Sequence, residues 1–273
     1  MEYKFCKICS SNIDPYLSQF GLMKCQKCGL IFSSESLQNK FTEELYDDLY
    51  SNDKAYEQHN KQANLIRRGI QPKLGKNKKI VIHSVIKKNR KYTIGEIGAG
   101  VGLVGKKLTD EGHNYTGFEI NSRIAADAKA SGVRIIASGF EGLVDYENHF
   151  DAIFAFEVLE HIDNLAECLN LIVRALKKEG QLGFTVPNSD KYKNFEKVQS
   201  NLFQSSPPVH LNFLNIENLK KILPLFGFHL IMLKVRPFPY LNLKDINTYK
   251  FIVKAFMHQY YGPNIMCVAK KED

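Results

Sequence analysis

The feature that most constrains the fold is the stretch Tyr92–Gly102, in which a short apolar run breaks into glycines at alternate positions. The apolar run predicts a buried strand, and the glycines predict a tight turn whose backbone N–H groups can approach a ligand closely. A helical pattern follows from Val101. A strand, a glycine turn and a helix in this order are typical of an α/β fold that binds a nucleotide-like ligand.

Predicted strands and helices alternate along the rest of the chain. Strands are expected at 92–97, 113–120, 133–137, 150–156, 181–186, 228–235 and 265–269, and helices at 101–110, 123–130, 165–176, 216–226 and 243–256, with a loop at 177–180. Residues 80–86 suit a buried helix and a strand equally well. The alternation predicts right-handed βαβ units around a parallel sheet, hence an α/β fold.

We expect the chain to divide into three parts. Residues 1–40 form a cysteine-bearing module, residues 41–91 a helical segment or lid, and residues 92–273 the main domain. Less regular insertions near 189–215 and 237–260 are expected to select the substrate.

The lid segment is polar with regularly placed aromatic residues. Phe41, Leu45 and Leu49 recur every four residues, which predicts a helix. These side chains are expected to pack the helix onto the main domain. Tyr50 and Tyr56 are candidates for covering a bound ligand.

Four of the six cysteines occur as two Cys-x-x-Cys pairs, Cys6 with Cys9 and Cys25 with Cys28. Each pair can place two thiolates on one tetrahedral ion, and Gly29 eases the turn after the last cysteine. Four sulfurs fill the coordination sphere, so we expect a structural Zn²⁺. Disulfides and a redox Cys-x-x-Cys are the alternatives; nothing in the sequence indicates export, and two matched pairs favour the metal.

The charge distribution does not identify the kind of molecule that the protein binds. The formal net charge is +8, and residues 71–91 contain eight Lys and Arg with no acidic residue. A solvated lysine-rich surface, an anionic small substrate and a polyanion all fit this excess. No apolar run approaches the roughly 20 residues of a membrane helix, and the first residues lack a signal-peptide pattern, so a cytoplasmic location is expected.

The glycines after the first strand can be read in two registers. Gly100–Gly105 matches the dinucleotide pattern, with Glu119 about 20 residues further on to bind a ribose. Glu96–Gly102 instead places an acid at the strand end, followed by three alternating glycines. Either match alone is weak, and an NAD oxidoreductase rests on the first register only.

Later motifs favour the second register. They are Phe118-Glu119-Ile120, the run Phe150–Ile162 with Glu157-Val158-Leu159-Glu160-His161 inside it, and Pro187-Asn188. Together with Glu96–Gly102, these motifs resemble those of class I S-adenosylmethionine-dependent methyltransferases, closely over about residues 92–188. The Glu157–His161 run resembles the small-molecule branch. The later His210-Leu211-Asn212-Phe213 also resembles this branch. The cysteine module followed by a tyrosine-rich segment resembles members that act on sugars and related metabolites.

The resemblance implies a Rossmann-like, doubly wound, mostly parallel seven-stranded sheet with an antiparallel last strand, and S-adenosylmethionine as the methyl donor. The residues that it places around this cofactor are Glu96, Gly98, Gly100, Gly102, Glu119, Ile120, Phe140, Phe156 and Glu157. Glu96 would meet the ammonium end, and the glycines would leave room for the ligand. Glu119, as an acceptor-only carboxylate, suits the two ribose hydroxyls. Ile120 and Phe140 are the expected walls of the adenine slot.

Methyl transfer is an in-line displacement, so much of the catalysis can come from holding the acceptor beside the methyl carbon. A hydroxyl acceptor must also lose a proton. His161, at the mouth of the fourth strand, and His210, in a Pro-Pro-Val-His loop, are the candidate general bases. Shaping of the pocket by His161 and anchoring of the loop by His210 are the alternatives, and an acceptor that is already ionised would need no base.

We therefore expect a methyltransferase that acts on a small polar, anionic metabolite, such as a nucleotide sugar or a phosphate-bearing precursor of surface polysaccharide or secondary metabolism. Oxygen is the expected acceptor atom, with nitrogen and carbon left open, and neither nucleic acid nor a membrane is an expected partner. One alternative is an RNA methyltransferase that binds RNA with the zinc module and the basic segment. A lysine-rich segment and the absence of Trp argue against this alternative. A second is a non-catalytic cofactor-binding scaffold, which the intact Glu96, Glu119 and Glu157–His161 disfavour.

Overall fold

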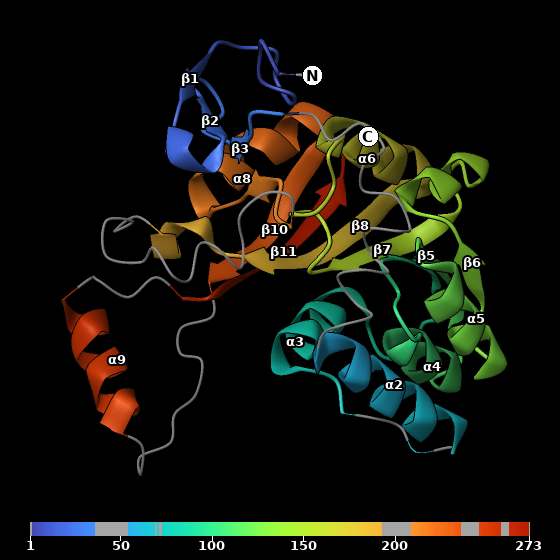
Figure 1. Cartoon of the computed structure of the whole chain (residues 1–273). Helices are drawn as coiled ribbons and strands as arrows, with labels where there is room; N and C mark the ends of the chain where they lie inside the picture. Colours follow the sequence, from blue (N-terminus) through green and yellow to red (C-terminus); the bar gives the residue numbers. More distant parts are fainter. Residues whose placement is uncertain are drawn as a thin grey trace.

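A seven-stranded sheet forms the centre of the computed structural model, which describes residues 2–35, 54–68, 70, 73–192, 209–235, 246–257 and 262–272 (Figure 1). The strand order is β10-β11-β8-β7-β4-β5-β6. The strands are β4 (Thr93–Ile97), β5 (Asn114–Glu119), β6 (Ile135–Ala137), β7 (Phe150–Phe156), β8 (Leu176–Pro187), β10 (Phe228–Val235) and β11 (Asn264–Lys271).

The strand directions create one ligand-binding edge. The pairings from β8 to β6 are parallel, whereas β11 runs antiparallel to both neighbours, β8 and β10. This confirms the mostly parallel sheet and its antiparallel last strand. The chain builds outward from β4 to β5 and β6, then returns to add β7 and β8 on the other side. The order therefore reverses between β4 and β7, and open α/β sheets bind ligands beyond the carboxyl ends of the strands at such a point.

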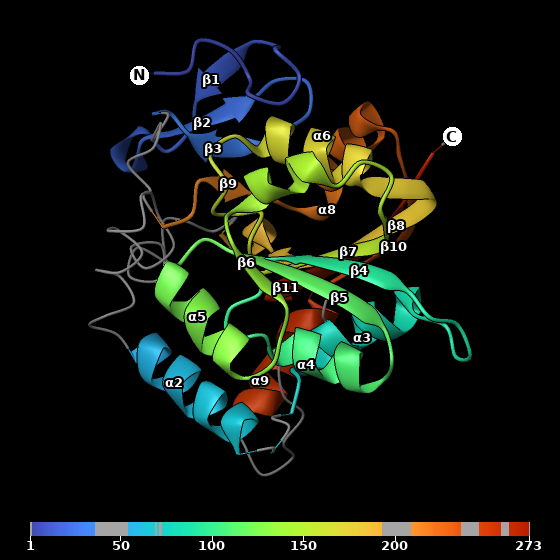
Figure 2. The same ribbon diagram turned by 90° about the vertical axis from the view of Figure 1, so that its right-hand side faces the viewer.

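One face of the sheet is covered by helices from the first half of the chain. α3 (Lys76–Val85), α4 (Leu103–Asp110) and α5 (Ser122–Ala130) lie on this face, and α2 (Lys54–Arg67) packs against α4 and α5 from outside (Figure 2). The ambiguous residues 80–86 thus belong mostly to a helix, α3, whose Val81, Ile82 and Val85 are buried.

The opposite face is covered by α6 (Leu165–Ala175), α8 (Ile216–Ile222) and the N-terminal strands (Figure 2). Because both faces are covered, the inner strands are apolar on both sides. The last five residues of β7 are all buried, as is typical of parallel strands. The 3₁₀ turns are η1 (Ser18–Phe20), η2 (Phe140–Asp145), η3 (Ser189–Tyr192) and η5 (Leu223–Phe226), and a further helix is α9 (Ile246–Phe256).

The N-terminal module, residues 2–35, contributes to a second sheet of order β1-β2-β3-β9. Its own strands are β1 (Ile13–Pro15), β2 (Leu22–Cys25) and β3 (Ile31–Ser33), whereas β9 (Asn212–Phe213) comes from the main domain. In this antiparallel pairing Phe32 lies opposite Asn212 and Ile31 opposite Phe213. The module and the main domain therefore share one sheet.

Side chains of the module reinforce this junction at Asp163. The Tyr3 hydroxyl donates to the Asp163 carboxylate at 2.9 Å, and the Lys7 ammonium donates to the Asp163 carbonyl at 3.0 Å. Asp163 follows the segment that leaves the carboxyl end of β7. The module is thus fixed against the edge of the sheet where a ligand is expected.

Two of the expected boundaries near the glycine turn and after α6 are wrong. α4 begins at Leu103, not Val101, because Gly102 has a φ of 77° and caps the helix in the left-handed conformation. Residues 177–180 belong to β8 and not to a loop, because Leu176 already pairs with Phe150 before the register shifts.

The helix expected at 216–226 is also shorter than predicted. The regular helix ends at Ile222, and the chain continues as the 3₁₀ turn η5, near whose start Pro224 lies. Proline lacks an N–H and so cannot supply the next helical hydrogen bond.

Several expectations lie outside the described residues. These are the helix through Phe41, Leu45 and Leu49, the side chains of Tyr50 and Tyr56, the loop 237–242 and most of the insertion 189–215. Among the helices that are described, none is both long enough and apolar enough to cross a membrane.

Candidate active site

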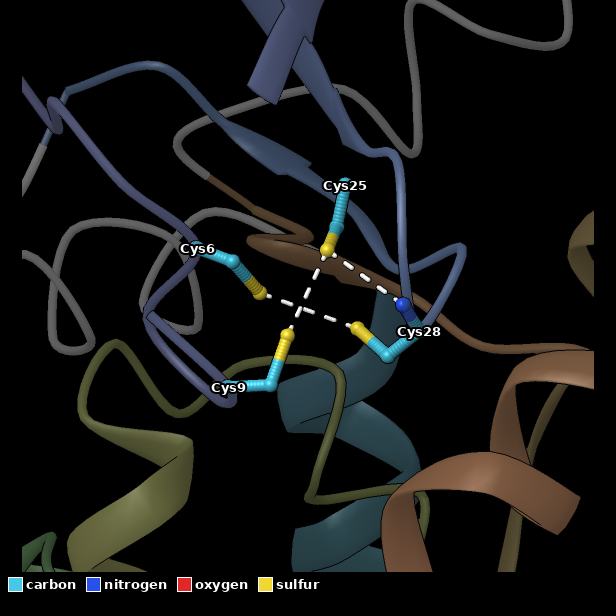
Figure 3. A group of neighbouring side chains, drawn as sticks. All are labelled: Cys6, Cys9, Cys25 and Cys28. Carbon is cyan, nitrogen blue, oxygen red and sulfur yellow. Dashed lines mark hydrogen bonds between the residues drawn. The ribbon is translucent and has the colours of Figure 1, made fainter. Parts of the chain in front are cut away.

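The four N-terminal cysteines converge from two loops of the module (Figure 3). The Sγ atoms of Cys6 and Cys28 are 3.6 Å apart, and those of Cys9 and Cys25 are 3.5 Å apart. Thiolates bound at about 2.3 Å around a tetrahedral ion stand about 3.8 Å from one another. Backbone N–H groups also donate to the sulfurs of Cys6 and Cys25 at 3.4 to 3.5 Å. The four side chains fit one tetrahedral metal ion.

The cysteine thiols differ in acidity. The pKa of Cys6 is lowered to about 5, chiefly by the hydrogen bond from the Cys28 thiol, and the same bond raises the pKa of Cys28. Cys168 and Cys267, outside the module, are buried, and burial raises the pKa of both thiols. Those two cysteines therefore have the character of inert core residues.

The glycine turn after β4 is left-handed at three positions, with φ of 67° at Gly98, 54° at Gly100 and 77° at Gly102. Glycine adopts this conformation without the penalty that a Cβ brings. A Cβ at Gly98 would lie 2.4 Å from Cγ2 of Val158. The sequence motif predicts that this space is left for a ligand, whereas the structure fills it with a side chain from the segment after β7. The turn and that segment are therefore in direct contact.

Glu119, at the end of β5, stabilises this turn by hydrogen bonds. Its Oε2 accepts a 2.8 Å hydrogen bond from the Gly100 N–H, and its Oε1 accepts a 3.0 Å bond from the Asn121 N–H. Burial raises the pKa of Glu119, and these backbone donors act in the opposite direction. Each carboxylate oxygen has room for a second hydrogen bond. Glu119 can therefore accept hydrogen bonds from a bound diol while holding the turn.

Glu96 lies deeper, at only 1% exposure, one residue before the end of β4. It accepts a hydrogen bond from the Tyr115 hydroxyl. Burial raises its pKa to about 7, although Lys78 and the Tyr115 bond lower it. The Lys78 ammonium lies 5.1 Å from the ring centre of Phe156, the last residue of β7. The Lys78 ammonium therefore lies against β7 and is near enough to Glu96 to favour its charged form.

The two expected walls of the adenine slot lie in adjacent segments. Ile120, after β5, is 39% exposed. A Cβ at Gly139 would lie 3.7 Å from Cδ1 of Ile120, so the start of η2 at Phe140 is next to it. The structure thus brings Ile120 and the Phe140 turn to one place.

The segment after β7 begins with a strained residue. Glu157 has a φ of 59°, which is uncommon for a residue other than glycine. Its carboxylate accepts hydrogen bonds from the Asn264 side-chain amide at 3.1 and 3.2 Å. Such conformations persist where the surroundings hold them, often at functional sites.

The two histidines proposed as alternative bases lie together. The ring centres of His161 and His210 are 4.8 Å apart, and Glu160 completes the cluster. Nδ1 of His161 lies 2.6 Å from the Val209 carbonyl oxygen, and its Nε2 lies 3.7 Å from Oε1 of Glu160. Burial lowers the pKa of His161, which favours the neutral ring.

A comparison with known families identifies this arrangement. The family described as "Methyltransferase domain" matches residues 70–233, more than half of the chain. The chain belongs to the class I S-adenosylmethionine-dependent methyltransferases. This methyltransferase is also 31% identical over 107 residues to the ubiquinone biosynthesis O-methyltransferase of Rickettsia conorii. That match spans 37% of this chain and 37% of the relative, little more than a third of the relative's length.

Solved structures share the fold of this methyltransferase. An S-adenosylmethionine-dependent methyltransferase from Listeria monocytogenes has a TM-score of 0.57 at 13% identity, covering 72% of this chain and 97% of its own. One from Archaeoglobus fulgidus has a TM-score of 0.52 at 18% identity, covering 83% and 98%. At these identities the likeness concerns the fold.

Two polar groups of this methyltransferase could not be predicted from the sequence. In the sequence Lys78 is one cation of the basic segment 71–91, and its effect on Glu96 depends on how α3 packs. Glu160 lay inside a recognised motif but received no role, because only the fold brings His210 to it. Glu160 is buried, at 2% exposure, and the motif alone does not indicate this burial.

Proposed function

We propose that the protein transfers the methyl group of S-adenosylmethionine to an oxygen atom of a small polar, anionic metabolite. The observation that carries this proposal is the contact between two segments. The glycine turn after β4 packs directly on Val158, and the Glu160–His161–His210 cluster begins two residues later. A cofactor held at the turn would present its methyl group toward this cluster.

The residues around the turn match the chemical groups of the cofactor. The zwitterionic amino-acid end would meet Glu96 with its ammonium and Lys78 with its carboxylate. The ribose hydroxyls would donate to Glu119, and the adenine would cover Ile120 and Phe140. Phe156 and Glu157 would line the sulfonium side, where a carboxylate and an aromatic ring both favour a cation.

We also propose that Cys6, Cys9, Cys25 and Cys28 hold a structural Zn²⁺. Four sulfur ligands leave no open position, so this ion would stabilise the module and not touch the acceptor. Because β3 pairs with β9 close to His210, the metal would indirectly hold the acceptor side of the site in place.

Oxygen is the acceptor atom that the Rickettsia relative and the histidine cluster support best. The Rickettsia relative is named an O-methyltransferase, and the histidine cluster suits an acceptor that must lose a proton. A cavity of about 170 Å³ lies between the module and the segment around β9. Its walls include Lys24 and Tyr16 on one side and Asp190 and Asn215 on the other, which suits a small polar group.

An RNA acceptor is less well supported, because part of the basic segment is engaged within the fold. Arg90 pairs with Asp151 and lies over the Tyr92 ring, while the Lys87 ammonium donates to the Ser84 carbonyl. A gel-shift assay with total RNA over a salt series tests this alternative, since binding through phosphate contacts weakens steeply with salt.

The decisive experiment is a methyl-transfer screen with isotopically labelled S-adenosylmethionine. The panel comprises nucleotide sugars, sugar phosphates and hydroxylated aromatic acids, with mass spectrometry to locate the label. We expect one class to gain a labelled O-methyl group, and the Glu119→Ala variant to lose binding of S-adenosylhomocysteine at least tenfold. Calorimetry that shows binding of NAD but of neither S-adenosylmethionine nor its product would refute the proposal.

A further inference from the structure

Three backbone carbonyls in the segment after β7 accept hydrogen bonds from β9 and the residue before it. The Leu211 and Asn212 N–H groups both donate to the Glu160 carbonyl, at 2.7 and 3.0 Å. The Asn212 side-chain amide donates to the carbonyls of Leu159 and Ile162, at 2.8 and 2.7 Å. The main domain thus fixes the course of this segment through its backbone.

A further carbonyl of the same segment, that of Asp163, is held by the N-terminal module. The Lys7 ammonium donates to this carbonyl at 3.0 Å, and it lies 3.8 Å from Oδ1 of Asp163. The second distance is too long for a hydrogen bond, so the direct contact is the one with the backbone. A bond to a carbonyl fixes the path of the chain, whereas an ion pair with a carboxylate fixes only a side chain. Lys7 therefore acts on the path of the segment two residues beyond His161.

The charged end of Lys7 is buried. Only 4% of its side chain is exposed, and lysine is almost never fully buried without a partner. Its Nζ atom lies 5.5 Å from the centre of the Tyr3 ring and 5.4 Å from that of the Phe32 ring, within the range of cation–π attraction. Burying a cation still carries a desolvation cost, which an apolar side chain of similar length would not have. A lysine at this position therefore indicates a role in directing the contact with Asp163, beyond filling space.

The backbone that carries Lys7 is fixed as well. Lys7 projects from a closed turn, because the Ser10 N–H donates to the Cys6 carbonyl and the Cys6 N–H donates to the Ser11 carbonyl, both at 2.9 Å. Phe32, over which the ammonium lies, belongs to β3, which pairs with β9. The module therefore reaches the segment after β7 by two routes, through β9 and through Lys7.

We propose that Lys7 is a positioning residue for methyl transfer, which holds the segment from Leu159 to Asp163 in the course that brings the rings of His161 and His210 together. These rings lie 4.8 Å apart, beyond the carboxyl end of β7. The inference rests on the proposed function, which places the acceptor on this side of the site. Because its ammonium is buried against Asp163, Lys7 acts on the acceptor through the backbone and not by direct contact.

The first test measures the ring contact directly, by nuclear magnetic resonance on the full-length protein loaded with Zn²⁺ and labelled at histidine. Rings whose centres are 4.8 Å apart give a nuclear Overhauser effect between their protons. We expect this signal in the wild type and its loss in Lys7→Met, which keeps the length of the buried chain but not the donor. Lys7→Arg keeps a donor and should retain more of the signal. The matched control is Lys4→Met, at an exposed lysine of the same module, which should give the wild-type signal.

The second test is kinetic and uses the acceptor that the labelled-donor screen identifies. Misplacement of the acceptor side slows transfer to the acceptor and leaves the donor site intact. We therefore expect Lys7→Met to lower kcat/KM for the acceptor about tenfold, and to bind S-adenosylhomocysteine with wild-type affinity in calorimetry. Its urea midpoint should stay close to that of the wild type, because methionine occupies the space of the lysine chain and no cation has to be buried.

The proposal fails if Lys7→Met leaves the ring signal and the kinetics unchanged, and it also fails if the wild type lacks the ring signal. A lower urea midpoint together with weaker S-adenosylhomocysteine binding overturns it too, since Lys7 would then support the fold as a whole. Loss of zinc from Lys7→Met, measured by elemental analysis, has the same consequence, because the effect would then come from the cysteines. If no compound of the panel accepts a methyl group, the proposed function fails, and the histidine signal still decides whether Lys7 positions the segment.

Discussion

Gly98→Ala separates two reasons for a glycine in the turn after β4. The first is the φ of 67°, since the left-handed conformation costs a residue with a Cβ about 1 to 2 kcal/mol. The second is contact, since the new Cβ would lie 2.4 Å from Cγ2 of Val158, and overpacking of this kind costs about 1 to 3 kcal/mol. The free energy of unfolding should therefore fall by about 2 to 5 kcal/mol, measured by urea unfolding with circular dichroism under saturating Zn²⁺.

Two further variants isolate these contributions. Gly132 has a φ of 79°, and a Cβ added there would meet no atom within 4 Å, so Gly132→Ala should lose only the conformational share, about 1 to 2 kcal/mol. Val158→Ala removes the obstructing methyl groups, so the double variant with Gly98→Ala should show a favourable coupling of about 1 to 3 kcal/mol. Equal losses for Gly98→Ala and Gly132→Ala, together with no coupling to Val158→Ala, would refute the packing argument.

Three other predictions follow from the charged and sulfur-bearing groups. Burial raises the pKa of Glu96 from 4.5 to about 7, so the folded state keeps this proton to a higher pH than the unfolded state does. The free energy of unfolding should therefore fall by about 3 kcal/mol between pH 4.5 and pH 7. Glu96→Gln should remove this part of the pH dependence of the urea midpoint, and an unchanged profile would contradict the assignment. Cys25→Ser should lose the bound Zn²⁺ in elemental analysis, whereas Cys168→Ala should keep it; retention of stoichiometric metal by the first variant would argue against a four-sulfur site. Lys78→Met should weaken binding of S-adenosylhomocysteine about tenfold in calorimetry, consistent with the loss of a charge-assisted hydrogen bond. Lys79→Met, at an exposed position, should not change the affinity. Equal affinities of the Lys78→Met variant and the wild type would exclude Lys78 from the cofactor site.

The sequence predicted most of the sheet because each strand carries a local signal. β7 and β10 have the predicted bounds. Errors arose where a tertiary contact decides the outcome. The early start of β8 depends on pairing between Leu176 and Phe150, and such a contact leaves no pattern within either segment alone.

The candidate site shows the same division. The residues Gly98, Glu119 and His161 could be named from the sequence, because they lie in motifs that resemble those of known methyltransferases. Lys78 and Glu160 could not, because their partners come from other elements of the fold. The sequence leaves the two histidines as alternative candidates for one role, since nothing in it shows that their rings are 4.8 Å apart.

The pairing of β3 with β9 has a consequence for how the chain is made. Phe32 leaves the ribosome about 180 residues before its partner Asn212, an interval on the order of ten to forty seconds at usual rates of synthesis. During that time β3 presents an open strand edge that can pair with other chains. Early capture of metal by the cysteines would order the module while its sheet is still incomplete. We therefore expect zinc-starved cells to accumulate this protein as aggregates formed during translation, and not as a soluble enzyme of reduced activity.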